Sequence, residues 1–508
     1  MKKSENTDEV KALKEALKRE QEKNAKLEAK NEALKTKHDA DKAEIRKLRR
    51  RKDPKPAASA KADEKAKPLS AKKKREDAQE HETSRVVRTA EGEARRAIPR
   101  YHFDELSIRL AILLFCHCGL SPRKIISVIG VFNMLFDGIA GKAPSHQTIF
   151  DWVLKYGLSL SQATGTLQEK NRALIIDNSV NMNGQELHLE LEAPATHPGH
   201  PLTHNDVWLV RMKVDKGWNV EMIKEQLRRA TSENAPEYIV SDNANTIGRA
   251  CREMEFRHHR DISHSFGVFL ERTYANTEEL SEFNQKLGFA RKYSHTAIGC
   301  LMPPKRRAYA RFMNIFDRID WAYSMLHNFF KLPPLGKSAF GFLQKQACFI
   351  EEMKNVMDWY RHMEELIKEK GLSRKTSNEC KRYIHATFMQ QDERLRNLGQ
   401  MLLDYFKQEE SLLESDDDVH NICSDIIESV FGYVKSRLSS NPNNGFTTLV
   451  LLVPAHLRVA NLSSCKGLDV HDNMASTRLN DITKWRRETL LANPCFSRAR
   501  TMSMAVGF

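Results

Sequence analysis

The sequence predicts an α/β protein in which a mixed β-sheet is interrupted by a long helical segment. Between residues 170 and 266, apolar runs of strand length and helical patterns follow one another in the order β-β-β-α-β-α-β. From 267 to 420 the pattern is almost wholly helical, and one more amphipathic helix follows within 421–460. We therefore expect a sheet domain built from 170–266 and 421–460, with 267–420 as an all-helical insertion.

The first fifty residues have the composition of a coiled coil. Residues 7–50 contain no Pro or Gly, and a heptad frame places apolar side chains at seven of its twelve a and d positions. Asn24 and Asn31 occupy a positions, where paired amides favour two parallel strands. We expect residues 1–50 to form a weak dimeric coiled coil, which makes the protein a homodimer. A single charged helix is the alternative.

Residues 51–102 predict a disordered basic linker. Lys, Ala, Pro and Glu dominate residues 52–84, and this segment has too few aliphatic side chains to offset the entropy cost of folding. Residues 1–100 hold 31 Lys and Arg against 20 Asp and Glu, which accounts for most of the net charge of +14. A basic arm on a nearly neutral body indicates a polyanionic partner, and a solvated tail is the alternative.

The composition argues against membrane and secreted proteins. No run approaches the roughly 18 apolar residues of a membrane span, and the charged N-terminus has no apolar signal core. The nine cysteines form no CxxC pair, which indicates reduced thiols. We expect a cytoplasmic protein with no membrane segment. The close pair Cys116-His-Cys118 lies in an apolar helix and is better explained by core packing than by zinc binding.

Three short helices are expected over 103–165, where Ser121 and Pro122 form an N-cap and a first-turn proline. The last of them carries apolar side chains at i, i+3, i+4 and i+7, namely Ile149, Trp152, Val153 and Tyr156. Its opposite face carries the candidates for DNA contact, namely His146, Gln147, Thr148 and Lys155. This arrangement is typical of a helix-turn-helix, whose last helix reaches base edges with its N-terminal residues. An ordinary three-helix packing unit is the alternative.

Three acidic residues suggest a site for divalent metal ions. Asp177 ends the first apolar strand, Asp242 ends the fourth, and Glu428 lies on the amphipathic helix within 421–460. A carboxylate at a buried strand end is costly unless it has a partner, and carboxylate oxygens are the ligands that Mg²⁺ prefers. A pair of ions about 4 Å apart can activate an attacking oxygen and stabilise a leaving one in phosphoryl transfer. Taken alone, each acid is better explained as an ordinary surface or strand-end carboxylate.

The order of these elements and acids resembles the RNase H-like core of DDE-type DNA transposases. Ile175-Ile-Asp177, followed by a hairpin at Gly184, is similar to the opening motif of the family, and Ser241-Asp242-Asn243 is similar to its second motif. The run from Ile427 to Lys435 resembles the catalytic-Glu helix of bacterial transposases, some of which carry a Lys seven residues after the Glu. The resemblance implies that Asp177, Asp242 and Glu428 hold two Mg²⁺ ions, with Mn²⁺ as a substitute, and that Lys435 holds a DNA phosphate.

The 186-residue spacing between Asp242 and Glu428 resembles the helical insertion of hAT-like transposases. Those proteins carry a Cys/Asp-x-x-His motif after the second Asp, and Asp261-Ile-Ser-His264 fits it. The resemblance implies that Asp261 and His264 orient the active site. We place this motif on a short fifth strand over 258–264. A short strand with a polar His and no catalytic role is the alternative.

Helical insertions of this family can also supply an aromatic side chain that stacks on a flipped base. Trp321 is our candidate, because a basic cluster lies just upstream of it, formed by Arg306, Arg307 and Arg311. A core tryptophan and a solvated basic face are the alternatives.

The resemblance implies an enzyme that cleaves transposon ends with Mg²⁺ and joins the freed 3′-hydroxyl to target DNA. Its partner would be double-stranded DNA, both terminal repeats and target, in the nucleoid of a bacterial cytoplasm. Residues 461–508 are predicted to be a basic C-terminal tail. Two alternatives remain: another RNase H-like metal nuclease that only cuts, and a non-catalytic, transposase-derived dimeric DNA-binding protein.

Overall fold

The computed structural model describes most of the chain from residue 97 onwards. The described residues are 87–88, 94–95, 97–136, 141–162, 171–178, 182–231, 234–292, 296–304, 315–437, 445–459, 470–493, 501–502 and 504. All of them belong to one compact unit, Glu82–Phe508.

The predicted coiled coil over 1–50 and most of the predicted linker lie outside the described residues. Within the linker range of 51–102, β1 (Val87–Arg88) pairs antiparallel with β2 (Ala94–Arg95), and Ile98 is buried in a hydrophobic cluster. The packed structure therefore extends to residues before 103, because Ile98 supplies a buried apolar side chain in this segment.

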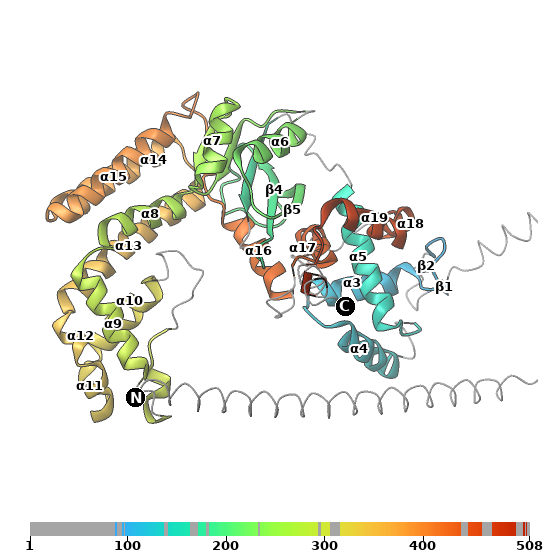
Figure 1. Cartoon of the computed structure of the whole chain (residues 1–508), viewed down its shortest axis with the longest axis horizontal. Helices are drawn as coiled ribbons and strands as arrows, with labels where there is room; N and C mark the ends of the chain where they lie inside the picture. Colours follow the sequence, from blue (N-terminus) through green and yellow to red (C-terminus); the bar gives the residue numbers. More distant parts are fainter. Residues whose placement is uncertain are drawn as a thin grey trace, which may run out of the picture. The chain divides into compact units, whose positions relative to one another are not determined.

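The sheet has five strands in the order β5-β4-β3-β6-β7. Figure 1 shows it in green, with β4 and β5 labelled. The strands are β3 (Arg172–Asn178), β4 (Glu186–Pro194), β5 (Trp208–Asp215), β6 (Tyr238–Ser241) and β7 (His258–Arg260). β4 is antiparallel to both β3 and β5, whereas β6 is parallel to both β3 and β7. The predicted order β-β-β-α-β-α-β is confirmed, and the strands, counted along the chain, lie in the order 3-2-1-4-5.

Helices cover both faces of this sheet, which explains why its central strand is a continuous apolar run. On one face, α6 (Val220–Ala230) and α7 (Asn245–Glu253) lie over a cluster that contains Leu174. On the other face, the side chains of α16 (Asp425–Arg437) pack in a cluster that contains Ile175. The helix that completes the sheet domain is thus supplied from a part of the chain far beyond the strands.

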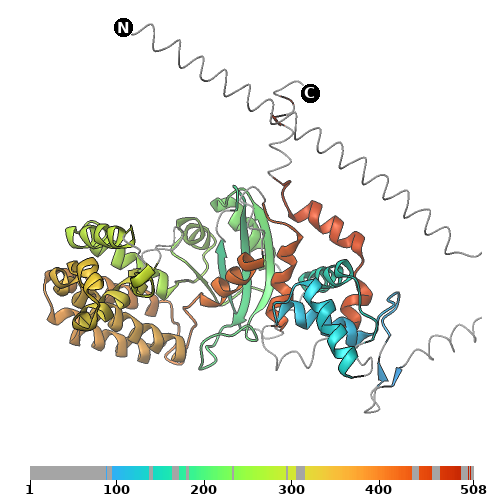
Figure 2. The same ribbon diagram turned by 90° about the horizontal axis from the view of Figure 1, so that it is seen from below.

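A long helical segment separates β7 from α16 (Figure 2). Its helices are α8 (Ile262–Tyr274), α9 (Glu278–Lys292), η1 (Thr296–Leu301), α10 (Ile315–His327), η3 (Phe329–Lys331), α11 (Pro334–Phe340), α12 (Phe342–Lys345), α13 (Ala347–Lys370), α14 (Arg374–Ala386), η4 (Phe388–Gln390) and α15 (Glu393–Glu410). They enclose a hydrophobic cluster of their own, in which Phe266 stacks on Tyr360 with ring centroids 4.6 Å apart. The helical pattern in the sequence therefore corresponds to a second hydrophobic core.

A buried polar joint connects this helical segment to the sheet. His259 of β7 lies 2.9 Å, through its Nδ1, from Oε2 of Glu409 on α15, and its Nε2 lies 2.9 Å from Nδ1 of His420. The His420 ring also stacks on Tyr238 of β6, with centroids 4.2 Å apart. Burial is the largest cause that lowers the pKa of His420 to about 4, so this ring is neutral in the folded protein near pH 7.

The chain before the sheet forms three helices: α3 (Glu105–Cys116), α4 (Pro122–Leu135) and α5 (His146–Gln162). They share a hydrophobic cluster with α17 (Leu452–Val459). The expected inner face of α5 is buried at Ile149, Trp152, Val153 and Tyr156. Cys116 is also buried in this cluster, as the core-packing interpretation expects, whereas Cys118 is exposed.

The described part of the predicted basic tail, 461–508, is folded onto this helical unit. α18 (His471–Ser476) and α19 (Leu479–Thr489) both pack against α5. Met474 and Ile482 are their buried anchors. The sequence does not indicate this packing, because each of the two helices buries only one apolar side chain among many charged and polar ones.

Replacing Gly157 with Ala tests the packing of α5 on η5 (Thr448–Leu451). A Cβ atom at Gly157 would overlap the backbone carbonyl of Leu451. We expect Gly157→Ala to lower the free energy of unfolding, measured in urea, by about 3 kcal/mol. Gly130 of α4 is exposed and a Cβ there meets no atom within 4 Å, so Gly130→Ala should be neutral or stabilising by up to about 1 kcal/mol. Equal effects of the two substitutions would contradict this packing.

Acid should weaken the joint at His420. Because the fold keeps this ring neutral with a pKa of about 4, the unfolded chain binds a proton first as the pH falls below about 6.5. Its contribution to stability is therefore full above pH 6.5 and is lost as the pH approaches 4. Between pH 7 and pH 5 we expect this residue to contribute a loss of about 2 kcal/mol in the free energy of unfolding.

The measurement compares urea unfolding at both pH values for wild type and His420→Asn. We expect the free energy of unfolding to fall less between pH 7 and pH 5 in the variant than in wild type, although the variant is less stable at pH 7. A pH dependence identical in both proteins would exclude His420 as the titrating group.

Candidate active site

Two buried carboxylates lie at the ends of neighbouring parallel strands. In the register of β3 and β6, Ile176 pairs with Ser241, so Asp177 and Asp242 are the next residues along the two strands. Each is only 7% exposed. Because side chains alternate along a strand, Asp177 shares the face of Ile175, which is the face that α16 covers.

Backbone amides fix one oxygen of each of these carboxylates. Asp177 Oδ1 accepts a hydrogen bond from the Asn178 N–H at 2.7 Å, and Asp242 Oδ1 accepts one from the Ala244 N–H at 2.9 Å. Such bonds hold the orientation of a carboxylate. The strand ends therefore present two oriented anionic side chains on the same edge of the sheet.

Glu428 lies on the first turn of α16, on the side away from the core. Its neighbours Ile427 and Val430 are buried against the sheet, whereas the Glu428 side chain is 52% exposed. One of its oxygens, Oε1, lies 2.9 Å from Nε2 of His264. The predicted auxiliary residue His264 thus contacts the predicted catalytic glutamate directly.

Asp261 holds His264 and the start of α16 in place. This carboxylate is fully buried, and its Oδ1 accepts from the His264 N–H at 2.7 Å and lies 2.8 Å from His264 Nδ1. Its Oδ2 accepts from both the N–H and the hydroxyl of Ser424, at 2.6 and 2.9 Å. Both oxygens are therefore occupied by donors, which offsets the cost of burying the charge.

The predicted fifth strand over 258–264 is too long. β7 ends at Arg260, and Asp261 is the N-cap of α8, so His264 lies in the first turn of a helix. An Asp that precedes an apolar helical run is a common N-cap, because its side chain accepts from a free N–H of the first turn. That local signal was present in the sequence and outweighs the strand pattern here.

Lys435 lies two helical turns after Glu428, near the same strand end. Its pKa is lowered mainly by partial desolvation, and the carboxylates of Asp177 and Glu428 oppose that shift. The electrostatic influence of both acids shows that the ammonium lies in their neighbourhood. Its amine also lies 5.7 Å from the centre of the Phe431 ring.

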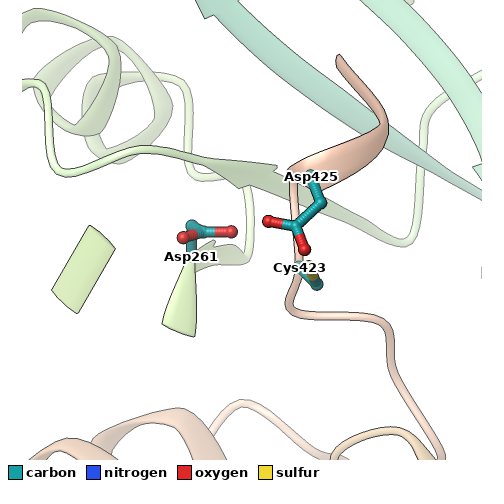
Figure 3. Close-up of side chains that lie close together, drawn as sticks. All are labelled: Asp261, Cys423 and Asp425. Atoms are coloured by element: carbon teal, nitrogen blue, oxygen red, sulfur yellow. The ribbon is translucent and has the colours of Figure 1, made fainter. Parts of the chain in front are cut away.

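A second group of possible metal ligands lies beside this site (Figure 3). Ligand atoms of Asp261, Cys423 and Asp425 all lie within 4.8 Å of one another, and theirs is the one such group in the part of the chain that the structure describes. Asp425 forms an ion pair with Lys368 at 2.6 Å. Burial, together with the charges of Asp261 and Asp425, raises the pKa of the Cys423 thiol well above its usual value. A protonated thiol and a carboxylate already holding four hydrogen bonds are poor metal ligands.

Sequence reasoning missed Cys423, Ser424 and Asp425. The signal for Ser424 was its position directly before an amphipathic helix, which favours a capping role. The oxygens of Asp177, Asp242 and Glu428, the three side chains expected to hold metal, do not all lie within 4.8 Å of one another. One oxygen of Glu428 instead contacts His264.

The predicted DNA-contact residues on α5 differ in their surroundings. His146 and Gln147 are exposed at its N-terminus, and Thr148 is half-buried with its hydroxyl 2.8 Å from that of Ser145. Lys155 donates to the Tyr101 hydroxyl at 3.1 Å. Contact of these side chains with DNA remains a prediction.

In the helical segment, the Trp321 indole N–H donates to the Leu301 carbonyl at 3.0 Å, and its ring packs edge-on against Phe340. These contacts favour the core interpretation of Trp321, and its stacking on a base remains a prediction. The basic cluster of Arg306, Arg307 and Arg311 lies outside the described residues.

No model of a protein family matches this chain, and no curated protein matches it. Among the helices that the structure describes, none combines the length and apolarity that a membrane crossing requires.

Replacing Asp261 with Asn tests whether this carboxylate is a hydrogen-bond anchor. An Asn side chain has one oxygen that accepts hydrogen bonds and one NH₂ group that donates them. The NH₂ group would therefore lie against the donors of either His264 or Ser424. We expect Asp261→Asn to lower the free energy of unfolding by about 2–3 kcal/mol. Asp425→Asn removes only a half-exposed ion pair and should cost less than about 1 kcal/mol.

Thermal and urea unfolding of the two variants provide the measurement. If both substitutions were equally damaging, and if Zn²⁺ or Mn²⁺ stabilised wild type but neither variant, the group of Asp261, Cys423 and Asp425 would instead be a metal site.

Proposed function

We propose that this chain is a DDE-type DNA transposase with an RNase H-like catalytic core. The observation that carries the proposal is the position of Asp177 and Asp242 directly after adjacent parallel strands, with the helix of Glu428 covering the sheet face to which Asp177 belongs. The 3-2-1-4-5 strand order and the helical segment before α16 support it.

The residue types fit a site for divalent ions. Asp177 and Asp242 are oriented carboxylates on one edge of the sheet, and Mg²⁺ prefers oxygen ligands of this kind. Asp177, Asp242 and Glu428 would hold two Mg²⁺ ions, with Mn²⁺ as a substitute. When bound, such ions supply the activation of an attacking oxygen and the stabilisation of a leaving one.

The neighbouring side chains have distinct roles in this proposal. His264, itself fixed by Asp261, holds the carboxylate of Glu428 in place. Lys435 brings an ammonium close to Asp177 and Glu428, where it would bind a phosphate of the DNA strand. The polar N-terminus of α5 would contact the terminal repeats in duplex DNA.

The proposed reaction has two steps. Water first cleaves a phosphodiester at the end of the element, and the freed 3′-hydroxyl then attacks a phosphodiester of target DNA, without a covalent protein intermediate. Two ends must be handled together, which we assign to a homodimer held by the predicted coiled coil over 1–50.

An excision assay in cells tests this proposal. The open reading frame and its native flanking DNA are placed on a plasmid, and precise excision and new insertions are counted. We expect Asp177→Asn, Asp242→Asn and Glu428→Gln each to reduce both counts at least about 100-fold, because each removes a ligand oxygen. Glu225→Gln is the matched control, since Glu225 is an exposed residue on the opposite face and pairs with Arg229.

Each outcome has a defined meaning. Cleavage without any insertion would favour a metal nuclease of the same fold. Specific binding of the flanking DNA without cleavage or excision by wild type would favour the non-catalytic DNA-binding protein. Equal activity of wild type and all three acid variants would refute this active site.

A further inference from the structure

A large pocket opens beside Asp242. It has a volume of about 670 Å³, which is within the usual range for a ligand site. Residues of α7 and α8 line it, Arg260 contributes from β7, and Leu412 contributes from the turn after α15. Because Asp242 itself lines the pocket, a ligand there would lie directly beside this proposed catalytic carboxylate.

Two arginines in this pocket lack partners. Arg252 near the end of α7 and Arg272 near the end of α8 are exposed, and within the described part of the chain neither side chain makes a hydrogen bond or an ion pair. Arg260, the third arginine, is held by Glu409 with Nε 3.3 Å from Oε1, so its charge is balanced. The pocket therefore holds two positive charges, on Arg252 and Arg272, against the one carboxylate of Asp242 in its lining.

The remaining lining suits a nucleotide. Phe256, which is half-buried, and Phe269, which is 8% exposed, contribute aromatic side chains to the lining, and Asn243 and Asn245 add amide groups. Burial lowers the pKa of His258 to about 4, so this lining residue is neutral near pH 7 and adds no charge. Free guanidinium groups bind phosphate through paired hydrogen bonds, and aromatic rings bind unstacked bases.

We propose that this pocket holds an unpaired nucleotide of the DNA strand that passes Asp242, with its phosphates bound by Arg252 and Arg272 and its base against Phe256 and Phe269. The assignment to a DNA strand rests on the proposed function. The binding of a phosphorylated nucleotide rests on the pocket alone.

The test measures DNA binding by fluorescence anisotropy with the full-length protein, in EDTA so that no cleavage occurs. The probes are a fluorescein-labelled blunt duplex and the same duplex with a five-nucleotide single-stranded overhang. We expect wild type to bind the overhang probe more tightly. In Arg252→Gln/Arg272→Gln, binding of the overhang probe should weaken roughly 10- to 100-fold, with little change for the blunt probe.

The salt dependence gives a second readout. Loss of two phosphate contacts to a single strand should reduce the slope of log affinity against log salt concentration by about 1.4. Arg249→Gln is the matched control, because Arg249 is an exposed arginine on the same helix that pairs with Glu253 and does not line the pocket. All three substituted arginines are exposed, so the variants should unfold at the wild-type midpoint.

Four outcomes decide the proposal. Loss of overhang binding in the double variant but not in Arg249→Gln supports it, and equal binding by wild type and the double variant overturns it. Competition by free deoxynucleoside monophosphate at the affinity of the overhang would overturn the strand assignment in favour of a free nucleotide. If wild type binds the overhang through these arginines but shows no Mg²⁺-dependent cleavage, the pocket stands and the proposed transposase activity fails.

Discussion

The candidate active site depends on one buried carboxylate, that of Asp261. It joins two segments more than 160 residues apart, because it caps α8 and accepts two hydrogen bonds from Ser424, just before α16. An ionised group with no exposure is tolerated only when all its lone pairs are used, and four donors surround this one. Asp261 fixes the position of Glu428 in two ways: it holds His264, which contacts Glu428, and it holds Ser424 at the start of the helix that carries Glu428.

This anchor solves a problem that the chain order creates. The sheet is incomplete without α16, yet the chain forms a second hydrophobic core between β7 and that helix. The residues at the end of the helical segment, just before α16, must therefore contact the residues at its start, just after β7. The contact of His259 with Glu409 and His420, next to Asp261–Ser424, provides this recognition with polar groups whose geometry is specific.

The strands and their acids were predictable because their signals are local. Ile175-Ile-Asp177 is an apolar run that ends in a carboxylate, and parallel pairing with the next such run brings Asp242 to the same edge. The helical start at Asp261 was misassigned because a short polar segment satisfies both a strand and a capping pattern. The packing of α18 and α19 on α5 could not be predicted, because a local sequence pattern shows that an apolar side chain is buried but not which distant helix it packs against.

The same long-range packing links the proposed DNA-reading helices to the proposed catalytic helix. At the end of α16, the Tyr433 hydroxyl donates to the Cys116 carbonyl at 3.2 Å, and Arg437 donates to the carbonyls of Gly119 and Phe115 at 3.2 and 3.3 Å. α16 is therefore held at its start by Asp261 and at its end by the C-terminal carbonyls of α3, which would otherwise lack partners. If the proposed function is correct, a helix fixed at both ends keeps the DNA-reading helices at a fixed distance from the catalytic carboxylates. The cut would then fall at a constant distance from the recognised sequence.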